Sequence, residues 1–263
     1  MGLRQVQNFK AAFERLFSYN TYMSNPYTDG SYLSNNPSWH AEDAPWKLSH
    51  ILRALSRVQT GRPTRVLDGG CGSGDIIKAW AKKAPQTQFV GWDISPQAHA
   101  LAVKNAPANV RFVCADEPPE GPFDLVLAID VIEHVENPGA WLKPLTARAP
   151  LMVLHVPLDL SFRSFLFPSL LERERQSVGH IHFFTARSLK NFLKENNCQI
   201  LSVHYTNKYV ERPPQLTHFK SRIGMCIRKM AHLLPHALPA FFIGGYSLML
   251  VVKTNHGTTT ARV

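Results

Sequence analysis

Cysteine is scarce in this chain of 263 residues, and its four copies lie far apart. They are Cys71, Cys114, Cys198 and Cys226, and no two of them have the spacing of a CxxC motif. The composition therefore argues against a zinc site built from paired cysteines and against a disulfide framework.

The first residues also lack the marks of a targeting segment. Residues 1–20 contain neither the apolar run nor the small-residue cleavage site of a secretory signal, and Val6 stands where N-myristoylation needs Ser or Thr. The apolar run 233–252 approaches the length of a membrane span, but prolines and the pair Gly244-Gly245 interrupt it. A buried strand with an apolar approach is favoured over a span, and we expect a cytoplasmic protein.

Acidic residues are outnumbered, with 19 Asp and Glu against 29 Lys and Arg and a formal net charge of +10 at pH 7. A basic excess favours anionic partners such as nucleic acid, acidic lipid or anionic metabolites. A basic protein with no polyanionic partner accounts for the same charge equally well. The excess is dense over 208–230, which holds six Lys or Arg and one Glu.

Strand patterns and helix patterns alternate from residue 65 onwards, which is typical of a mostly parallel α/β sheet covered by helices on both faces. The continuous apolar run in 123–130 predicts a strand buried on both sides. No crossover helix immediately precedes the last strand, so an antiparallel edge strand is expected there. The expected strands are 65–70, 88–95, 110–116, 123–130, 151–157, 199–206 and 246–253, and the expected helices are 75–84, 96–105, 138–148 and 186–197.

One α/β domain over 61–254 accounts for this pattern, preceded by a helical or lid-like extension over 1–60. Insertions are expected at 158–182, which reads as irregular, and at 207–243. The extension is expected to contain a short amphipathic helix over 7–17, a loop or lid over 20–45 and a helix over 46–58, and the tail 255–263 is expected to be disordered.

The stretch "VLDGGCGSGD" places Gly70, Gly72 and Gly74 between a strand and a helix, where a nucleotide-type ligand can approach the backbone. The third glycine arrives one residue too early for the dinucleotide fingerprint GxGxxG, and no GK[ST] follows as in a phosphate-binding loop. Asp93 ends the next strand, where a carboxylate accepts ribose hydroxyls, and Asp116 ends the third, within reach of an adenine amino group. A strand-end cap and an ordinary loop aspartate are the alternatives for these two residues.

With "FVGWDIS", "FVCAD", "FDLVLAIDVIEHVENPGAWL" and "GHIHFFTARSLKNFL", this loop resembles the successive motifs of class I S-adenosylmethionine-dependent methyltransferases. The resemblance covers roughly 64–206 and extends to the ubiquinone-biosynthesis O-methyltransferases and related small-molecule enzymes. It implies a Rossmann-like sheet of seven strands with a reversed last strand, S-adenosylmethionine as cofactor and S-adenosylhomocysteine as product. An oxidoreductase using NAD is the rival that the glycine spacing disfavours.

The resemblance also implies which residues hold the cofactor. The loop residues are expected around its methionine and ribose, Asp93 at the ribose, Asp116 beside the adenine, and the end of the fourth strand beside the sulfonium. The full expected set is Asp68, Gly70, Cys71, Gly72, Gly74, Asp93, Ile94, Asp116, Glu117, Ile129 and Asp130.

Catalysis is expected from Glu133 and His134 at the end of the fourth strand, where His134 could act as the proton acceptor that helps transfer to oxygen. The alternative is that these two are loop and helix-start residues that touch the cofactor. The resemblance implies that His180, the third candidate, lies near the mouth of the active site. Asp130-x-x-Glu133-His134 resembles a divalent-metal arrangement of some relatives, but the loose spacing favours a site without metal. His180 and His182 at alternate positions suggest a zinc pair, and with no third ligand at recognisable spacing this reading is disfavoured. His155 in a buried strand is interpreted as a core histidine.

The methyl acceptor is expected to be a small apolar, aromatic or lipid-like molecule, most simply methylated on oxygen. "DVIE" replaces the motif of base N-methyltransferases, no cysteine follows proline, and no aromatic-basic stacking motif is present, which argues against nucleic acid. The apolar stretch 158–177 and the basic segment 208–243 suit a membrane surface or a lid. Methylation of nitrogen or carbon, an RNA or protein substrate, and a cofactor-binding partner subunit without activity remain alternatives.

Overall fold

The computed structural model describes residue 27, residues 29–213 and residues 219–254. The helix expected over 7–17 and the tail 255–263 lie outside the described residues. Within them, helices and strands follow the expected alternation, and each expected strand and helix from 65 to 253 is present with its ends shifted by a few residues.

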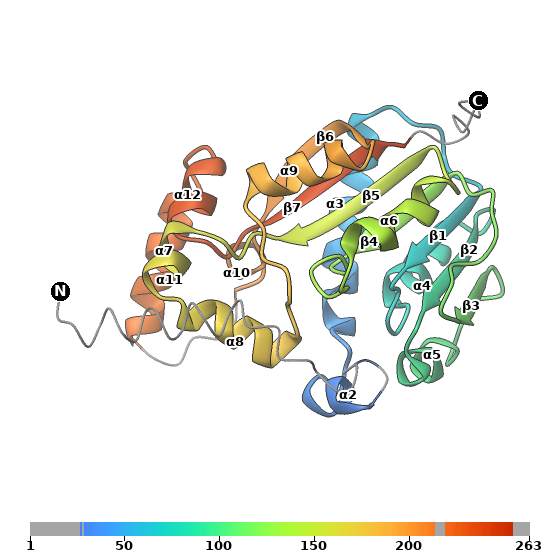
Figure 1. The fold of residues 1–263 in the computed structure, drawn as a ribbon, viewed down its shortest axis with the longest axis horizontal. Coiled ribbons are helices and arrows are strands. Elements are labelled where there is room, and N and C mark those ends of the chain that lie inside the picture. The colour runs from blue at the N-terminus through green and yellow to red at the C-terminus, as the bar shows by residue number, and fades with distance from the viewer. Residues whose placement is uncertain (1–26, 28, 214–218, 255–263) are drawn as a thin grey trace.

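A seven-stranded sheet in the order β3-β2-β1-β4-β5-β7-β6 forms the centre of the described chain (Figure 1). β1 pairs in parallel with β2 and β4, β2 with β3, and β4 with β5, while β7 is antiparallel to both its neighbours. The expected mostly parallel sheet with a reversed last strand is therefore confirmed. The strands are β1 Arg65–Gly69, β2 Gln88–Asp93, β3 Val110–Cys114, β4 Leu125–Ile129, β5 Leu151–Pro157, β6 Gln199–Thr206 and β7 Ser247–Lys253.

The sequence predicts that the reversed strand lies at the edge of the sheet, and this is wrong. The strand lies inside the sheet, between β5 and β6. Five consecutive residues of β7, from Leu248 to Val252, are buried, so this strand suits a position covered on both faces and paired on both sides. β6 is less buried along its length and has a register irregularity between Ile200 and Ser202, which suits the edge.

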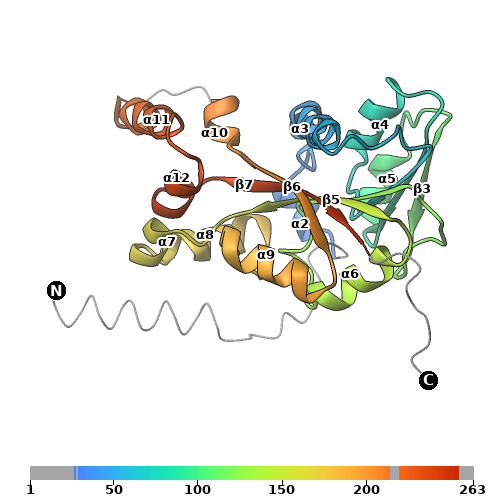
Figure 2. The same cartoon turned by 90° about the horizontal axis from the view of Figure 1, so that it is seen from above.

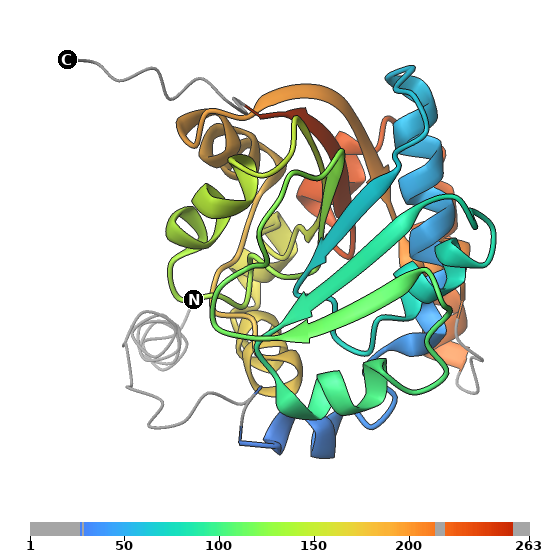
Figure 3. The same cartoon turned by 90° about the vertical axis from the view of Figure 1, so that its right-hand side faces the viewer.

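Two layers of helices cover the sheet, as Figures 2 and 3 show from two directions. α3 (Ala44–Arg57) and α4 (Asp75–Ala81) pack on one face, and α6 (Pro138–Thr146) and α9 (Ala186–Glu195) on the other. α3 buries Leu48, Ile51 and Leu55 at helical spacing, which gives it one apolar stripe toward the sheet. α5 (Pro96–Ala102) begins where the Ser95 side chain accepts a hydrogen bond from Ala98 N.

Both insertions are helical. The first is expected from its sequence to be irregular, but it forms α7 (Phe162–Leu166) and α8 (Ser169–Val178). Reciprocal hydrogen bonds between Ser161 and Ser164 start α7, and Gly179 in a left-handed conformation ends α8, so local capping sets both helices. The second insertion forms α10 (Lys208–Glu211), α11 (Phe219–Ala231) and α12 (Ala237–Phe242).

Among the described residues, no helix is both long and apolar enough to cross a membrane. The apolar run 233–252 is divided between α12 and the buried strand β7, as the sequence favours. The N-terminal extension contributes the short helix α2 (Ser31–Asn35) and a 3₁₀ turn at Ala41–Asp43 before α3.

The interior position of β7 predicts a large cost for truncating its core. Leu250 is fully buried, so Leu250→Ala is expected to lower the free energy of unfolding by about 2–5 kcal/mol in urea denaturation. Leu201 on the edge strand β6 is 41% exposed, and Leu201→Ala is expected to change it by about 0.5 kcal/mol or less. Equal effects of the two substitutions would contradict the interior placement of β7.

Candidate functional site

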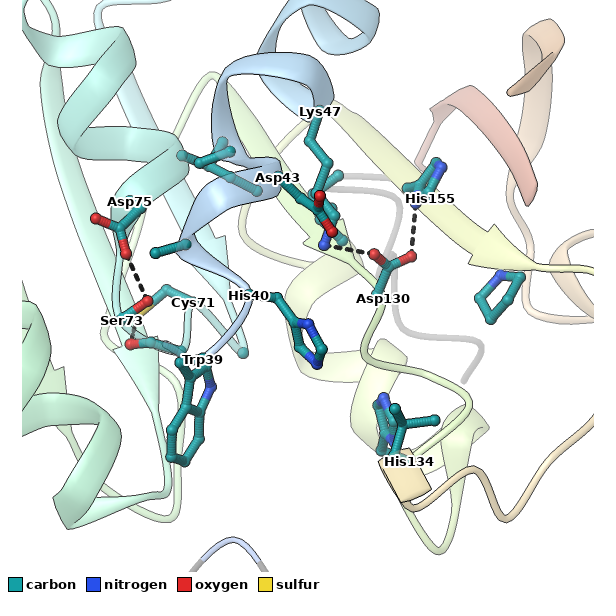
Figure 4. Close-up of a pocket in the computed structure, with 18 of the residues that line it drawn as sticks. Trp39, His40, Asp43, Lys47, Cys71, Ser73, Asp75, Asp130, His134 and His155 are labelled. Carbon is teal, nitrogen blue, oxygen red and sulfur yellow. Dashed lines mark hydrogen bonds and ion pairs between the residues drawn. The ribbon is translucent and has the colours of Figure 1, made fainter. Parts of the chain in front are cut away.

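A cavity of about 300 Å³ lies at the carboxyl ends of β1 and β4, the edge where parallel α/β sheets bind ligands (Figure 4). The N-terminal extension and the start of α3 border it on one side, and the segment that ends α8 borders it on the other. Nine of the residues predicted from the sequence line it: Asp68, Gly70, Cys71, Gly72, Ile129, Asp130, Glu133, His134 and His180.

The glycine loop is held to β2 by its own backbone, because Gly70 N and Cys71 N both donate to Trp92 O, at 2.8 and 3.0 Å. Gly72 has a φ of 54°, and a Cβ there would lie 2.5 Å from the indole Nε1 of Trp39. Glycine is therefore required at this position both by the backbone conformation and by the close approach of the tryptophan.

Asp93 lies behind the loop rather than in the cavity lining. Its Oδ2 accepts from Gly72 N at 2.7 Å and its Oδ1 from Ser95 N at 2.9 Å, so it ties the loop to the end of β2. Four further predicted cofactor residues also lie outside the lining, and their roles stay predictions: Gly74, Ile94, Asp116 and Glu117.

Asp68, at the end of β1, brings a buried carboxylate to the cavity. Burial, and then the charge of Asp93, raise the pKa of Asp68 to about 7. A carboxylate in this position is suited to a cationic group, whose charge would favour its ionised form.

Asp130, at the end of β4, is held on both of its carboxylate oxygens. Lys47 Nζ lies 2.7 Å from Oδ2, and His155 Nδ1 lies 2.5 Å from Oδ1 (Figure 4). The other nitrogen of His155 is 2.9 Å from Thr206 Oγ1. Burial alone would raise the pKa of Asp130, but His155 and Lys47 hold it well below its usual range.

His155 is thus a buried histidine with both nitrogens satisfied, as the sequence interpretation holds, although one partner belongs to the site. Lys47 is not a candidate from the sequence, since a lysine in the first turns of a helix is ordinary. Only the packing of α3 across the carboxyl edge of the sheet brings it to Asp130.

Glu133, His134 and His180 meet in one cluster, with one ligand-type atom of each within 4.8 Å of the others. The backbone carbonyl of Glu133 accepts from Ile181 N and His182 N, at 2.9 and 3.0 Å, which draws the segment after α8 onto the end of β4. Neither carboxylate oxygen of Glu133 has a hydrogen-bond partner among the described residues, although the side chain is fully buried.

The pKa values within this cluster diverge. Burial, and then the charge of Asp130, raise the pKa of Glu133 to about 8. Burial alone would lower the pKa of His180, but the hydrogen bond from its Nδ1 to Asp159 Oδ2, at 2.8 Å, and the charge of Asp159 raise it to about 9. Burial, and then the charge of His180, lower the pKa of His134 to about 3.

Asp159 is missed by the sequence reasoning because it stands in a segment that reads as irregular. The cluster also revises the metal arrangement considered from the sequence, because at the end of β4 the ligand-type atoms that lie together belong to Glu133, His134 and His180. The carboxylate of Asp130 is engaged by Lys47 and His155 instead. His182 does not pair with His180, since its Nε2 lies 3.2 Å from the carbonyl of Glu136.

The described part of the segment predicted as a lid lies against this cavity. Tyr27 Oη is 2.7 Å from His134 Nδ1, and the Tyr27 and Tyr32 rings are 4.6 Å apart. The Tyr32 ring is 4.8 Å from that of Trp39, which covers Gly72. These aromatic residues join the two ends of the cavity, and the sequence indicates them only through the aromatic and polar composition of 20–45.

Several curated methyltransferases resemble part of the chain, and two of them are compared with it below. A ribosomal protein L11 methyltransferase of Ralstonia pickettii is 46% identical over 125 residues, covering 39% of this chain and 41% of that protein. A malonyl-[acyl-carrier protein] O-methyltransferase of Halalkalibacterium halodurans is 28% identical over 114 residues, covering 37% and 42%. The chain therefore spans about two fifths of the length of these relatives.

Solved structures share the fold over more of the chain. The plantazolicin methyltransferase BpumL, in complex with a desmethylPZN analogue and S-adenosylhomocysteine, has a TM-score of 0.55 at 18% identity, covering 96% of this chain and 100% of that one. The [4+2]-cyclase SpnF has a TM-score of 0.54 at 16% identity, covering 80% and 82%. At these identities the likeness shows the fold alone.

The family described as methyltransferase domain matches residues 40–203, more than half of the chain. The match includes the glycine loop, the ends of β1 and β4, and the cluster around Glu133. This chain therefore belongs to the methyltransferase-domain family, whose enzymes take their methyl group from S-adenosylmethionine.

Proposed function

We propose that this protein transfers a methyl group from S-adenosylmethionine to an oxygen atom of a small apolar or aromatic acceptor. The observation that carries the proposal is that one cavity has a glycine loop at one end and a buried titratable cluster at the other. A methyl donor bound along the loop and an acceptor bound at the cluster would meet inside it, as an in-line displacement requires.

The residues at the glycine-loop end of the cavity fit the cofactor. The loop carries a glycine at which a Cβ has no room, and Asp68 offers a buried carboxylate for the ammonium of its methionine part. When bound, S-adenosylmethionine supplies a methyl group on a positively charged sulfur. The chain's part is to hold it toward Ile129 and the cluster, in a cavity bordered by Tyr32 and Trp39.

The residues at the other end of the cavity, around Glu133 and His180, suit an oxygen acceptor. The carboxylate of Glu133 makes no hydrogen bond among the described residues, so it can accept the proton of an acceptor hydroxyl, and its raised pKa makes it a proton acceptor matched to mildly alkaline pH. His180, held as a cation by Asp159, donates a hydrogen bond to the acceptor oxygen as that oxygen loses its proton. The methyl group would then bond to the oxygen as its bond to the sulfur breaks, S-adenosylhomocysteine would leave, and the proton would remain on Glu133.

Apolar and aromatic side chains support the choice of acceptor, since Trp46, Ile129 and Val178 line the same cavity. One relative is named as a methyltransferase of ribosomal protein L11 and the other as an O-methyltransferase of malonyl-[acyl-carrier protein]. A protein side chain and a carboxylate are therefore the competing methyl acceptors. SpnF shares the fold and is named as a cyclase, so the fold alone does not establish methyl transfer and turnover must be measured. The likeness to ubiquinone-biosynthesis enzymes stays a prediction.

Binding of the cofactor is predicted to depend on Asp68. Asp68→Asn is expected to weaken the affinity for S-adenosylhomocysteine about tenfold or more in titration calorimetry, because a charged hydrogen bond to the ammonium is lost. Asp124→Asn, at the opposite end of the sheet, is the matched control and is expected to leave the affinity unchanged. Binding of NAD in place of S-adenosylhomocysteine would contradict the proposal.

Turnover is predicted to have a bell-shaped dependence on pH. The rate should rise as Glu133 loses its proton around pH 8 and fall as His180 loses its proton around pH 9. Asp159→Asn removes the charge that raises the pKa of His180, so the alkaline limb should move toward neutral pH. Both limbs are measured as the rate at which labelled methyl groups are transferred to hydroxylated aromatic acceptors over a series of pH values.

Two variants sharpen this test. Glu133→Gln is expected to reduce turnover about a hundredfold or more while leaving S-adenosylhomocysteine binding intact. His182→Gln, two residues from His180, is the control and should keep the wild-type profile, because its ring bonds the carbonyl of Glu136 and His182 belongs neither to the cavity lining nor to the cluster of Glu133, His134 and His180. Transfer to a ribosomal protein with none to small acceptors would overturn the proposed substrate class.

A further inference from the structure

Large apolar side chains are exposed along α7 and along the end of α11 and α12. Leu233 is 87% exposed, Met230 71% and Phe165 61%, values unusual for such residues on a surface that meets only water. We call this set the apolar face; it consists of Phe162, Phe165, Leu166, Phe167, Met230, Leu233, Leu234, Leu238, Phe241 and Phe242.

The two halves of the apolar face come from insertions far apart in the sequence, yet they form one surface. The rings of Phe162 and Phe242 lie 6.1 Å apart, edge to face. Gly244, with a φ of 73°, passes so close to α7 that a Cβ there would lie 2.8 Å from Ser161 Oγ. Figures 1 and 2 both show α7, α11 and α12 together at the end of the molecule opposite β3.

The surroundings of the apolar face carry positive charge. From residue 212 to residue 263 the sequence contains no Asp or Glu. Arg163 on α7 and Lys229 on α11 are exposed. Arg228 is half-buried between the halves, where its Nη1 donates to Gly244 O at 3.2 Å. Apolar side chains rimmed by Lys and Arg are the combination that binds the interface of an anionic membrane.

We propose that the apolar face docks on an anionic phospholipid bilayer, with its Phe and Leu side chains in the interface and Arg163 and Lys229 against the lipid phosphates. The helices concerned are too short to span a bilayer, so they lie in the plane of its surface. A lipid surface is favoured over a protein partner because the face has flexible basic side chains at its rim and no acidic residue from 212 onwards.

The position of this face connects it with the cavity. α8 follows α7 directly and lines the cavity through Glu174 and Val178, while Lys208 of α10 lines it from the other insertion. If the proposed apolar acceptor is correct, docking would bring the side of the cavity formed by these helices near the lipid from which the acceptor comes. The docking itself does not depend on the acceptor.

Flotation of the full chain with vesicles tests the docking. The protein is expected to float with vesicles of phosphatidylcholine and phosphatidylglycerol, and much less with phosphatidylcholine alone. Phe165→Asp combined with Phe241→Asp is expected to weaken binding about a hundredfold or more, since two exposed aromatic side chains that would enter the lipid interface become charged. Arg163→Glu combined with Lys229→Glu is expected to weaken it about tenfold or more, chiefly for the anionic vesicles.

Matched controls come from the far end of the molecule. Val103→Asp, at an exposed apolar residue beside α5, and Lys82→Glu combined with Lys83→Glu, at the end of α4, are expected to leave flotation unchanged. Calorimetry with S-adenosylhomocysteine verifies that every variant still folds and binds cofactor, which separates this test from that of the proposed function. Leu233→Asp, at the most exposed position, serves if the double variant does not fold.

Two results would overturn the docking: absence of the full chain from the lipid fraction, or equal flotation of the face variants and the wild type. Self-association seen by light scattering, lost in the Phe165→Asp and Phe241→Asp variant and without flotation, would assign the face to a second copy of the chain instead.

Discussion

The carboxylate of Asp130 joins four elements at the carboxyl edge of the sheet. Asp130 follows the last residue of β4, and its carboxylate forms an ion pair with Lys47 of α3 and a hydrogen bond with His155 of β5. The other nitrogen of His155 is hydrogen-bonded to Thr206 of β6. A carboxylate that is mostly removed from water is stabilised by such partners, and it in turn positions Lys47 and His155. The cavity depends on this arrangement because α3 carries the wall that faces the glycine loop.

The same network explains how two neighbouring carboxylates acquire opposite properties. Asp130 stays ionised between a lysine and a histidine, whereas Glu133, three residues further along, is buried without a hydrogen-bond partner among the described residues, and the charge of Asp130 raises its pKa. Environments that push pKa values apart separate a structural carboxylate from one able to exchange protons near the working pH. Asp159 adds the third element by keeping His180 charged.

The two insertions add helices to the sheet at one end of the molecule. They build one wall of the cavity through α8 and α10 and, on the outside, an exposed apolar face through α7 and α12. The glycine at 244 is what permits this joint role, because the chain after α12 crosses the start of α7 too closely for any side chain. The wall of the cavity and the apolar face are therefore parts of one packed unit.

Much of the fold could be predicted from the sequence, because its determinants are local: apolar periodicity, turn residues and helix caps are set by neighbours a few positions apart. These identified the strands, the helices between them, the glycine loop, and Glu133 and His134 at the end of a strand, while His180 was indicated by the resemblance to the methyltransferase family. Only the tertiary structure decided that β7 lies inside the sheet, that Lys47 and Asp159 reach Asp130 and His180, and that two distant insertions share one face. Such contacts depend on strand order and on the packing of segments that are far apart in the sequence, which no local pattern encodes.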